Sequence, residues 1–243
     1  MGASGPIDVT FDFRSDTPPG GDPDSLSPTL KRYHQLLWSK PLPRGAQFEL
    51  DDTTPGVYLH HVSELGEFFL SSDAVVPSFT REVRLRDVVA QIPQTELDEF
   101  NRIGYTIGGM MIFPGNKIGN KMTINGARGF HPRIKDRFDL TVECIRRHYL
   151  GELSPLSETL ARYAEFFALF GDFRGYVDFF LLQDIATEDY AAVKCFTPFA
   201  GFDVSPLPNG FDAYDAYRRH AIEFIEARNC RVNAYAKRST PEP

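Results

Sequence analysis

The chain has 243 residues, of which 26 are lysine or arginine and 33 are aspartate or glutamate, giving a formal net charge of −7. Hydrophobic residues make up 42% of it and aromatic residues 13%, proportions that exclude a disordered, coiled-coil or collagen-like chain. The sequence holds no apolar run of about 18 residues and no signal peptide at its start, which predicts a cytoplasmic protein without a membrane partner.

Residues 1–55 are predicted to form an N-terminal arm. The arm holds eight of the 18 prolines, so most of it is expected to be extended or to turn. One helix is expected within it, because Ser27 followed by Pro28 is typical of a helix start and apolar residues then recur at helical spacing. This helix should end before Pro41 and pack on the rest of the chain.

Alternating apolar residues from Val57 onwards predict a mostly antiparallel sheet in the first half of the chain. Its strands are expected around Tyr58–Val62, Phe68–Leu70 and Val83–Leu85. A short helix at Glu96–Arg102 follows, with Thr95 and Asp98 in the positions of a capping box.

The apolar run Tyr105–Phe113 predicts a buried strand in which Gly108 and Gly109 allow a close backbone approach. Residues Pro114–Asn120 are typical of a turn, and Lys121–Asn125 is expected to be the return strand.

The second half of the chain is predicted to be helical. The expected helices are Ile134–Tyr149, Pro155–Gly171, a buried Tyr176–Ile185 and Asp212–Arg228, with one late strand at Ala191–Phe196. These elements indicate an α+β fold, in which residues 56–243 form a single domain and the arm wraps around it.

The charge is unevenly distributed along the chain. Residues 1–100 carry a net charge of −8, residues 101–148 carry +6 and residues 149–243 carry −5. Most of the positive charge in the middle segment lies in Gly115–Arg137, which we call the basic island. Its proposed ligand-binding residues are Lys121, Asn125, Arg128, Arg133 and Arg137. Guanidinium and amide groups near flexible glycines suit a phosphate-bearing partner, either a nucleotide or a nucleic acid.

Three alternatives remain open at this stage. The glycine- and asparagine-rich start of the basic island is also what a solvated turn contains. Its cations could instead pair with acidic residues of the arm, namely Asp12, Asp16, Asp22 and Asp24. In that case the protein would be a protein-interaction module with a structural basic island.

A metal-independent enzyme acting on RNA or nucleotides, of a toxin or phage-defence kind, is the other reading. His131 would then be the general acid or base, with Arg128 and Arg133 stabilising the transition state and Asn125 orienting the substrate. The sequence lacks GxGxxG, Walker A, HExxH, CxxC and EF-hand motifs, so it predicts no metal and no cofactor.

Arg174 lies among aromatic residues in the segment Gly171–Phe180. One expectation is that it is buried and paired with Asp172, Asp178 or Asp184, because charges in apolar surroundings must be paired. The other is that it forms a second wall of the ligand pocket.

Several stretches of the chain resemble a bacterial family that carries a domain-of-unknown-function label. The resemblance spans nearly the whole chain, which implies that the arm belongs to the domain, and it implies no activity, cofactor or catalytic residue. The stretches that carry it are Phe11–Pro43, Thr123–Tyr149, Leu160–Ile185 and Phe224–Asn229.

Overall fold

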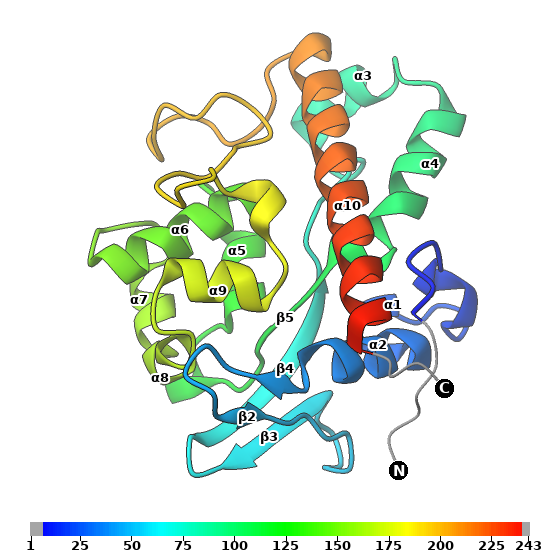
Figure 1. Cartoon of the computed structure of the whole chain (residues 1–243). Coiled ribbons are helices and arrows are strands. Elements are labelled where there is room, and N and C mark those ends of the chain that lie inside the picture. Colours follow the sequence, from blue (N-terminus) through cyan, green and yellow to red (C-terminus); the bar gives the residue numbers. More distant parts are fainter. Residues whose placement is uncertain (1–6, 240–243) are drawn as a thin grey trace.

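A computed structural model describes residues 7–239 and shows the predicted α+β fold (Figure 1). A three-stranded antiparallel sheet is built from the first half of the chain, and helices make up most of the second half. The longest helix, α10 (Phe211–Ser239), passes along the molecule with α3 and α4 on one side and α6 and α9 on the other.

The arm contains the predicted helix. The helix α2 (Pro28–Trp38) starts where the Ser27 side chain accepts a hydrogen bond from the Leu30 N–H, with Pro28 in the first turn. It is preceded by a 3₁₀ turn at Phe13–Asp16 and by α1 (Pro23–Leu26). Trp38 and its apolar neighbours are fully buried, so the arm contributes directly to the core.

The strands β3 (Leu59–Ser63), β4 (Gly66–Ala74) and β5 (Met110–Pro114) form the sheet in the order β3-β4-β5. Two further two-residue strands, β1 (Lys40–Pro41) and β2 (Gln47–Phe48), form a hairpin beside it. The strand predicted at Val83–Leu85 is wrong, because that segment is a 3₁₀ turn that leads into α3 (Arg86–Val89).

The helix α4 (Gln94–Gly104) confirms the prediction at Glu96–Arg102, but the helix begins after Pro93 and no capping side chain bonds its N-terminus. The buried strand starts only at Met110, because Ile107–Gly109 forms a 3₁₀ turn. The close approach predicted at Gly108 is confirmed, since a Cβ there would lie 2.3 Å from the Ile225 carbonyl oxygen of α10.

The return strand predicted at Lys121–Asn125 is wrong. Thr123 instead begins the helix α5 (Ile124–Phe130), and its hydroxyl accepts a hydrogen bond from the Gly126 N–H at 3.4 Å. A threonine that satisfies a free N–H of the first turn favours a helix over a strand. Asn125 and Arg128 therefore project from one short helix that packs against β4 and β5.

The helical second half is more fragmented than predicted. The helix α6 (Phe138–Leu150) ends at the predicted Gly151, which has a left-handed backbone conformation. The expected Pro155–Gly171 helix is divided into α7 (Ser157–Ala161) and α8 (Ala164–Ala168). The expected Tyr176–Ile185 helix is α9 (Phe173–Phe179), which stops before Leu181 at φ 55°, followed by a 3₁₀ turn at Gln183–Ile185.

The late strand predicted at Ala191–Phe196 is wrong, because Val193 makes only an isolated antiparallel bridge with Ala186. The final helix is longer than the predicted Asp212–Arg228, since α10 continues to Ser239. Its buried residues pack on the turn at Ile107–Gly109 and on α4, so α10 connects the two halves of the chain.

Candidate functional site

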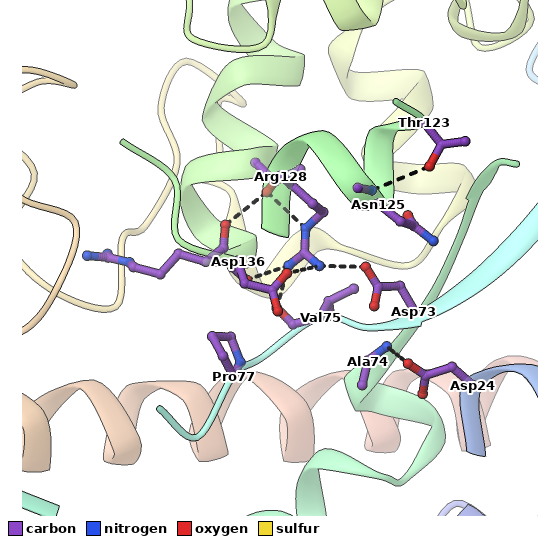
Figure 2. A network of polar contacts seen from close by, with 12 residues as sticks. Asp24, Asp73, Ala74, Val75, Pro77, Thr123, Asn125, Arg128 and Asp136 are labelled. Atoms are coloured by element: carbon purple, nitrogen blue, oxygen red, sulfur yellow. Dashed lines mark hydrogen bonds and ion pairs between the residues drawn. The ribbon is translucent and has the colours of Figure 1, made fainter. Parts of the chain in front are cut away.

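Arg128 is the best-connected residue of the basic island. Its side chain is fully buried and donates four hydrogen bonds, to Asp73, to Thr141 and to the carbonyl oxygens of Val75 and Asp136, and its Nη1 also forms an ion pair of 2.6 Å with the Asp136 carboxylate. Figure 2 shows its guanidinium reaching between the two carboxylates. Arg128 therefore holds protein groups together from inside the structure.

The two carboxylates come from opposite sides of Arg128. Asp73 lies near the end of β4, and its Oδ2 is 2.7 Å from Arg128 Nη1. Asp136 lies in the turn before α6, where Lys135 and Asp136 both have left-handed φ values of 50° and 64°. This conformation is unfavourable for residues other than glycine, and the bonds to Arg128 compensate for it.

A surface cavity of about 780 Å³ lies beside these carboxylates. The end of β4, the following loop, α1, α4 and the C-terminal end of α5 all contribute to its wall. Its lining includes four acidic and two basic residues together with aromatic rings, namely Asp24, Asp73, Glu82, Asp136, Arg81, Lys135, Phe79, Phe100, Tyr105 and Phe130. We call it the acidic cavity.

Asp24 brings a third carboxylate to this wall from the arm. Its Oδ2 accepts a hydrogen bond of 3.0 Å from the Ala74 N–H, as Figure 2 shows. Its Oδ1 is buried and has no hydrogen-bond partner within residues 7–239. Burial raises the pKa of Asp24 to about 6, since a desolvated carboxylate is costly and the N–H of Ala74 stabilises it only in part.

The pKa values of the other two carboxyl groups are also raised. Burial raises the pKa of Asp73 to about 7, against the opposing attraction of Arg128, and Asp136 and Asp24 raise it further through repulsion. Burial likewise raises the pKa of Asp136, against the attraction of Arg128. Carboxyl groups with a raised pKa beside a cavity are typical of binding and catalytic sites.

The other predicted ligand-binding residues of the basic island, Lys121, Asn125, Arg133 and Arg137, do not line the acidic cavity. Arg137 is buried and paired with Asp139, and it also donates to Thr197 and the Pro206 carbonyl. Lys121 is exposed, and Arg133 makes an exposed ion pair of 3.1 Å with Asp203.

Asn125 and His131 have local partners. The Asn125 amide donates to the Ser71 hydroxyl and the Ser72 carbonyl, which connects α5 to β4. His131 Nδ1 accepts a hydrogen bond of 3.1 Å from the Arg133 N–H. Burial, together with the Arg133 charge, lowers the pKa of His131, so its ring is neutral at pH 7.

Arg174 is not buried as expected, because 70% of its side chain is exposed. It does pair with one predicted partner, Asp178, at 3.6 Å, and its guanidinium also lies 5.0 Å from the centre of the Tyr190 ring. It lines a separate cavity of about 410 Å³ together with Arg44, so it does not form a second wall of the acidic cavity.

Sequence reasoning missed Asp73 and Asp136 as site residues, and it considered Asp24 only as part of a cover. Asp73 and Arg128 are separated by 55 positions, so no local motif connects them. The left-handed turn at Lys135 and Asp136 has no glycine to mark it. A buried arginine needs carboxylate partners, and this requirement is the signal that could have pointed to Asp73 and Asp136.

Within residues 7–239, no group of three or more histidine, cysteine, aspartate or glutamate side chains is placed to hold a metal ion. The same residues contain no helix with the length and apolar character that a membrane crossing requires.

The profile of a family of unknown function, DUF6994, matches residues 7–232 and so covers most of the arm and nearly all of the remaining chain. No curated protein and no solved structure matches the chain.

Proposed function

We propose that this protein, which belongs to the family of unknown function DUF6994, binds a small organic ammonium compound in the acidic cavity. The observation that carries the proposal is the meeting of Asp73 and Asp136 at the cavity wall around a single buried arginine. Their side chains remain 20% and 39% exposed, so both have surface available to a ligand.

The charge of the cavity favours a cation. Four acidic side chains line it, against two basic ones, and Arg128 behind the wall adds a third positive charge. When all four acids are ionised, the three cations leave a net charge of −1 around the cavity. Lys135 forms an ion pair of 3.0 Å with Glu82, so the Glu82 carboxylate offsets part of the repulsion between Lys135 and a cationic ligand.

The aromatic lining suits the same class of ligand. The cavity is lined by Phe79, Phe100, Tyr105 and Phe130, and Phe130 is 81% exposed. Aromatic faces attract ammonium groups through their quadrupoles, with about 0.5–2 kcal/mol for each well-placed contact. Carboxylates and aromatic rings together therefore offer a cation both charge neutralisation and apolar contact.

Calorimetric titration with benzylammonium chloride and with choline chloride tests this proposal. At least one of the two should bind the wild-type protein, and Asp136→Asn should weaken that binding by about tenfold because one carboxylate charge is lost. The matched control is Asp203→Asn, which removes an exposed carboxylate outside the cavity. Equal affinity in both variants, or no binding of either compound to the wild type, would refute the proposal.

A phosphate-bearing partner remains the second candidate. Lys121 and Arg133 are exposed, so the surface of the basic island keeps cations available even though Arg128 and Arg137 are used internally. AMP and a short RNA should then bind in a salt-dependent way, and Lys121→Ala combined with Arg133→Ala should abolish binding. Binding that is unaffected by both substitutions would exclude this surface.

The enzymatic alternative places acid–base chemistry at His131. RNA or nucleotide hydrolysis that disappears in His131→Gln, while the fold is retained, would support it. A cytoplasmic location and a bacterial source, both expected from the sequence, belong to the proposal in either case.

A further inference from the structure

Asp73 and Asp136 share one atom of Arg128. Asp73 Oδ2 lies 2.7 Å and Asp136 Oδ1 lies 2.6 Å from the same nitrogen, Nη1. The two oxygens therefore cannot be farther apart than these distances together, 5.3 Å. Two carboxylates within this distance repel each other when both are ionised, and here a single arginine faces both of them.

The surrounding charges do not remove this repulsion. Arg128 supplies one positive charge for the two carboxylates, and its other donors are held by Thr141 and by carbonyl oxygens. The neighbouring elements contribute both signs. The groups near the pair are Asp24 from α1, Tyr105 after α4, Tyr217 from α10, and Arg81, Glu82 and Lys135 around the cavity. The carboxyl group of Asp24 adds a further negative charge close to Asp73 when it is ionised.

We infer that the Asp73–Asp136 pair holds a proton in the ligand-free protein and releases it when an ammonium compound enters the acidic cavity. This inference rests on the proposed function. Before binding, the pair carries one negative charge, which Arg128 neutralises. The incoming ammonium group then supplies the second positive charge that lets both carboxyl groups ionise.

The exchange balances in charge and in atoms. One O–H bond of the pair breaks, its proton passes to a buffer base, and no covalent bond of the ligand changes. The ammonium ion keeps its own protons and forms an ion pair with the carboxylate that has been set free. Binding of one monovalent cation therefore releases one proton, and affinity should increase as the pH rises from 5 to 8.

Benzylammonium titrations in two buffers of different ionisation enthalpy, PIPES and ACES, measure this exchange at the same pH. Because the protonated form of each buffer carries an ammonium group beside a sulfonate, titration of the protein with each buffer alone is the control for competition. Near pH 6.5 we expect the observed binding enthalpies to differ by an amount that corresponds to the release of close to one proton. In Asp136→Asn the difference should fall towards zero, because the remaining carboxylate is neutralised by Arg128. Equal enthalpies in both buffers for the wild type would overturn the inference while leaving the proposed function intact.

Carbon-13 NMR of the aspartate carboxyl groups tests the shared proton without any ligand. In the wild type, one of the two carboxyl groups should titrate well above the usual range of aspartate, and in Asp136→Asn the titration of Asp73 should move to lower pH. Ordinary titration of both groups in the wild type would also overturn the inference. If benzylammonium and choline both fail to bind but this titration is seen, the proposed function and the release of the proton on binding are refuted, and the proton held by the ligand-free pair is retained.

Discussion

Arg128 and Asp136 bind each other through both their side chains and their backbones. Arg128 Nη1 contacts the Asp136 carboxylate at 2.6 Å, Nη2 donates to the Asp136 carbonyl, and the Asp136 N–H donates to the Arg128 carbonyl at 3.0 Å. The same contacts therefore close the turn between α5 and α6 and place a carboxylate at the cavity wall. Stability and the proposed binding site depend on one set of bonds.

Replacing Arg128 with methionine should destabilise the protein strongly. The substitution leaves Asp73 and Asp136 without their shared cation, and breaking a buried ion pair typically costs about 3–5 kcal/mol. Urea unfolding of Arg128→Met and of the control Arg133→Met measures this cost. The exposed pair of Arg133 with Asp203 should contribute less than about 1 kcal/mol. Equal losses in the two variants would contradict the structural role of Arg128.

Substitution of Asp24 by asparagine should stabilise the protein at neutral pH. The folded-state pKa of Asp24, about 6, is above its ordinary value of 3.8, so the folded protein binds the Asp24 proton more tightly than the unfolded chain does. Protonation of Asp24 therefore contributes stability that is fully present below pH 3.8 and is lost as the pH rises through about 6. Asparagine stays neutral and can still accept the hydrogen bond from Ala74.

The measurement for Asp24→Asn is the free energy of unfolding at several pH values between 4 and 8. The variant should gain about 1 kcal/mol relative to the wild type between pH 4 and pH 7. The opposite result is a wild-type free energy of unfolding that rises above that of Asp24→Asn as the pH increases. It would show that the ionised carboxylate stabilises the protein.

Lys40 should make stability rise with pH on the alkaline side. Burial, with a smaller effect of Arg228, lowers its pKa from 10.5 to about 7, so between these values the unfolded chain binds the proton more tightly. Stability should therefore increase from pH 7 to pH 10. Lys40→Met should flatten this slope, whereas the exposed Lys194→Met should leave it unchanged. An identical slope in Lys40→Met and the wild type would show that Lys40 does not titrate as proposed.

The contact between Gly108 and α10 leaves no room for a side chain. A Cβ at this position would lie 2.3 Å from the Ile225 carbonyl oxygen and 2.8 Å from Asn229 Oδ1, which accepts the hydrogen bond from the Gly108 N–H. Gly108→Ala should lower the thermal midpoint by several degrees, since overpacking of this kind costs about 1–3 kcal/mol and each kcal/mol shifts the midpoint of a chain of this length by about 2–4 °C.

The matched control is Gly126→Ala in α5, where the nearest atom would lie at 3.5 Å. Alanine favours a helix by about 1 kcal/mol over glycine, so this variant should be as stable as the wild type or more stable. If Gly108→Ala proves as stable as Gly126→Ala, the packing between α10 and the turn before β5 is not as tight as described.

Local signals in the sequence predict much of the fold. Ser27 with Pro28 marks the start of α2, Gly151 marks the end of α6, and the alternation around Phe68 marks β4. Errors occur where a short-range signal was ambiguous. Thr123 follows a turn and is equally suited to a strand, and its role as a helix cap depends on how α5 packs against the sheet.

The candidate site was only partly predictable. The excess of basic residues identified the segment that contains Arg128, but composition cannot show whether an arginine faces solvent or carboxylates. The answer depends on Asp73, which comes from β4, and on Asp136, whose left-handed backbone has no glycine to mark it. The role of Arg128 beside an acidic cavity therefore depends on contacts between segments that are far apart in the sequence.

A crystal structure of the protein grown with benzylammonium chloride tests the central claim most directly. We predict that the ammonium nitrogen lies within about 3 Å of a carboxylate oxygen of Asp73 or Asp136, with the aromatic ring among the phenylalanines of the cavity. Benzylammonium bound elsewhere, with the acidic cavity holding only water, would contradict the account.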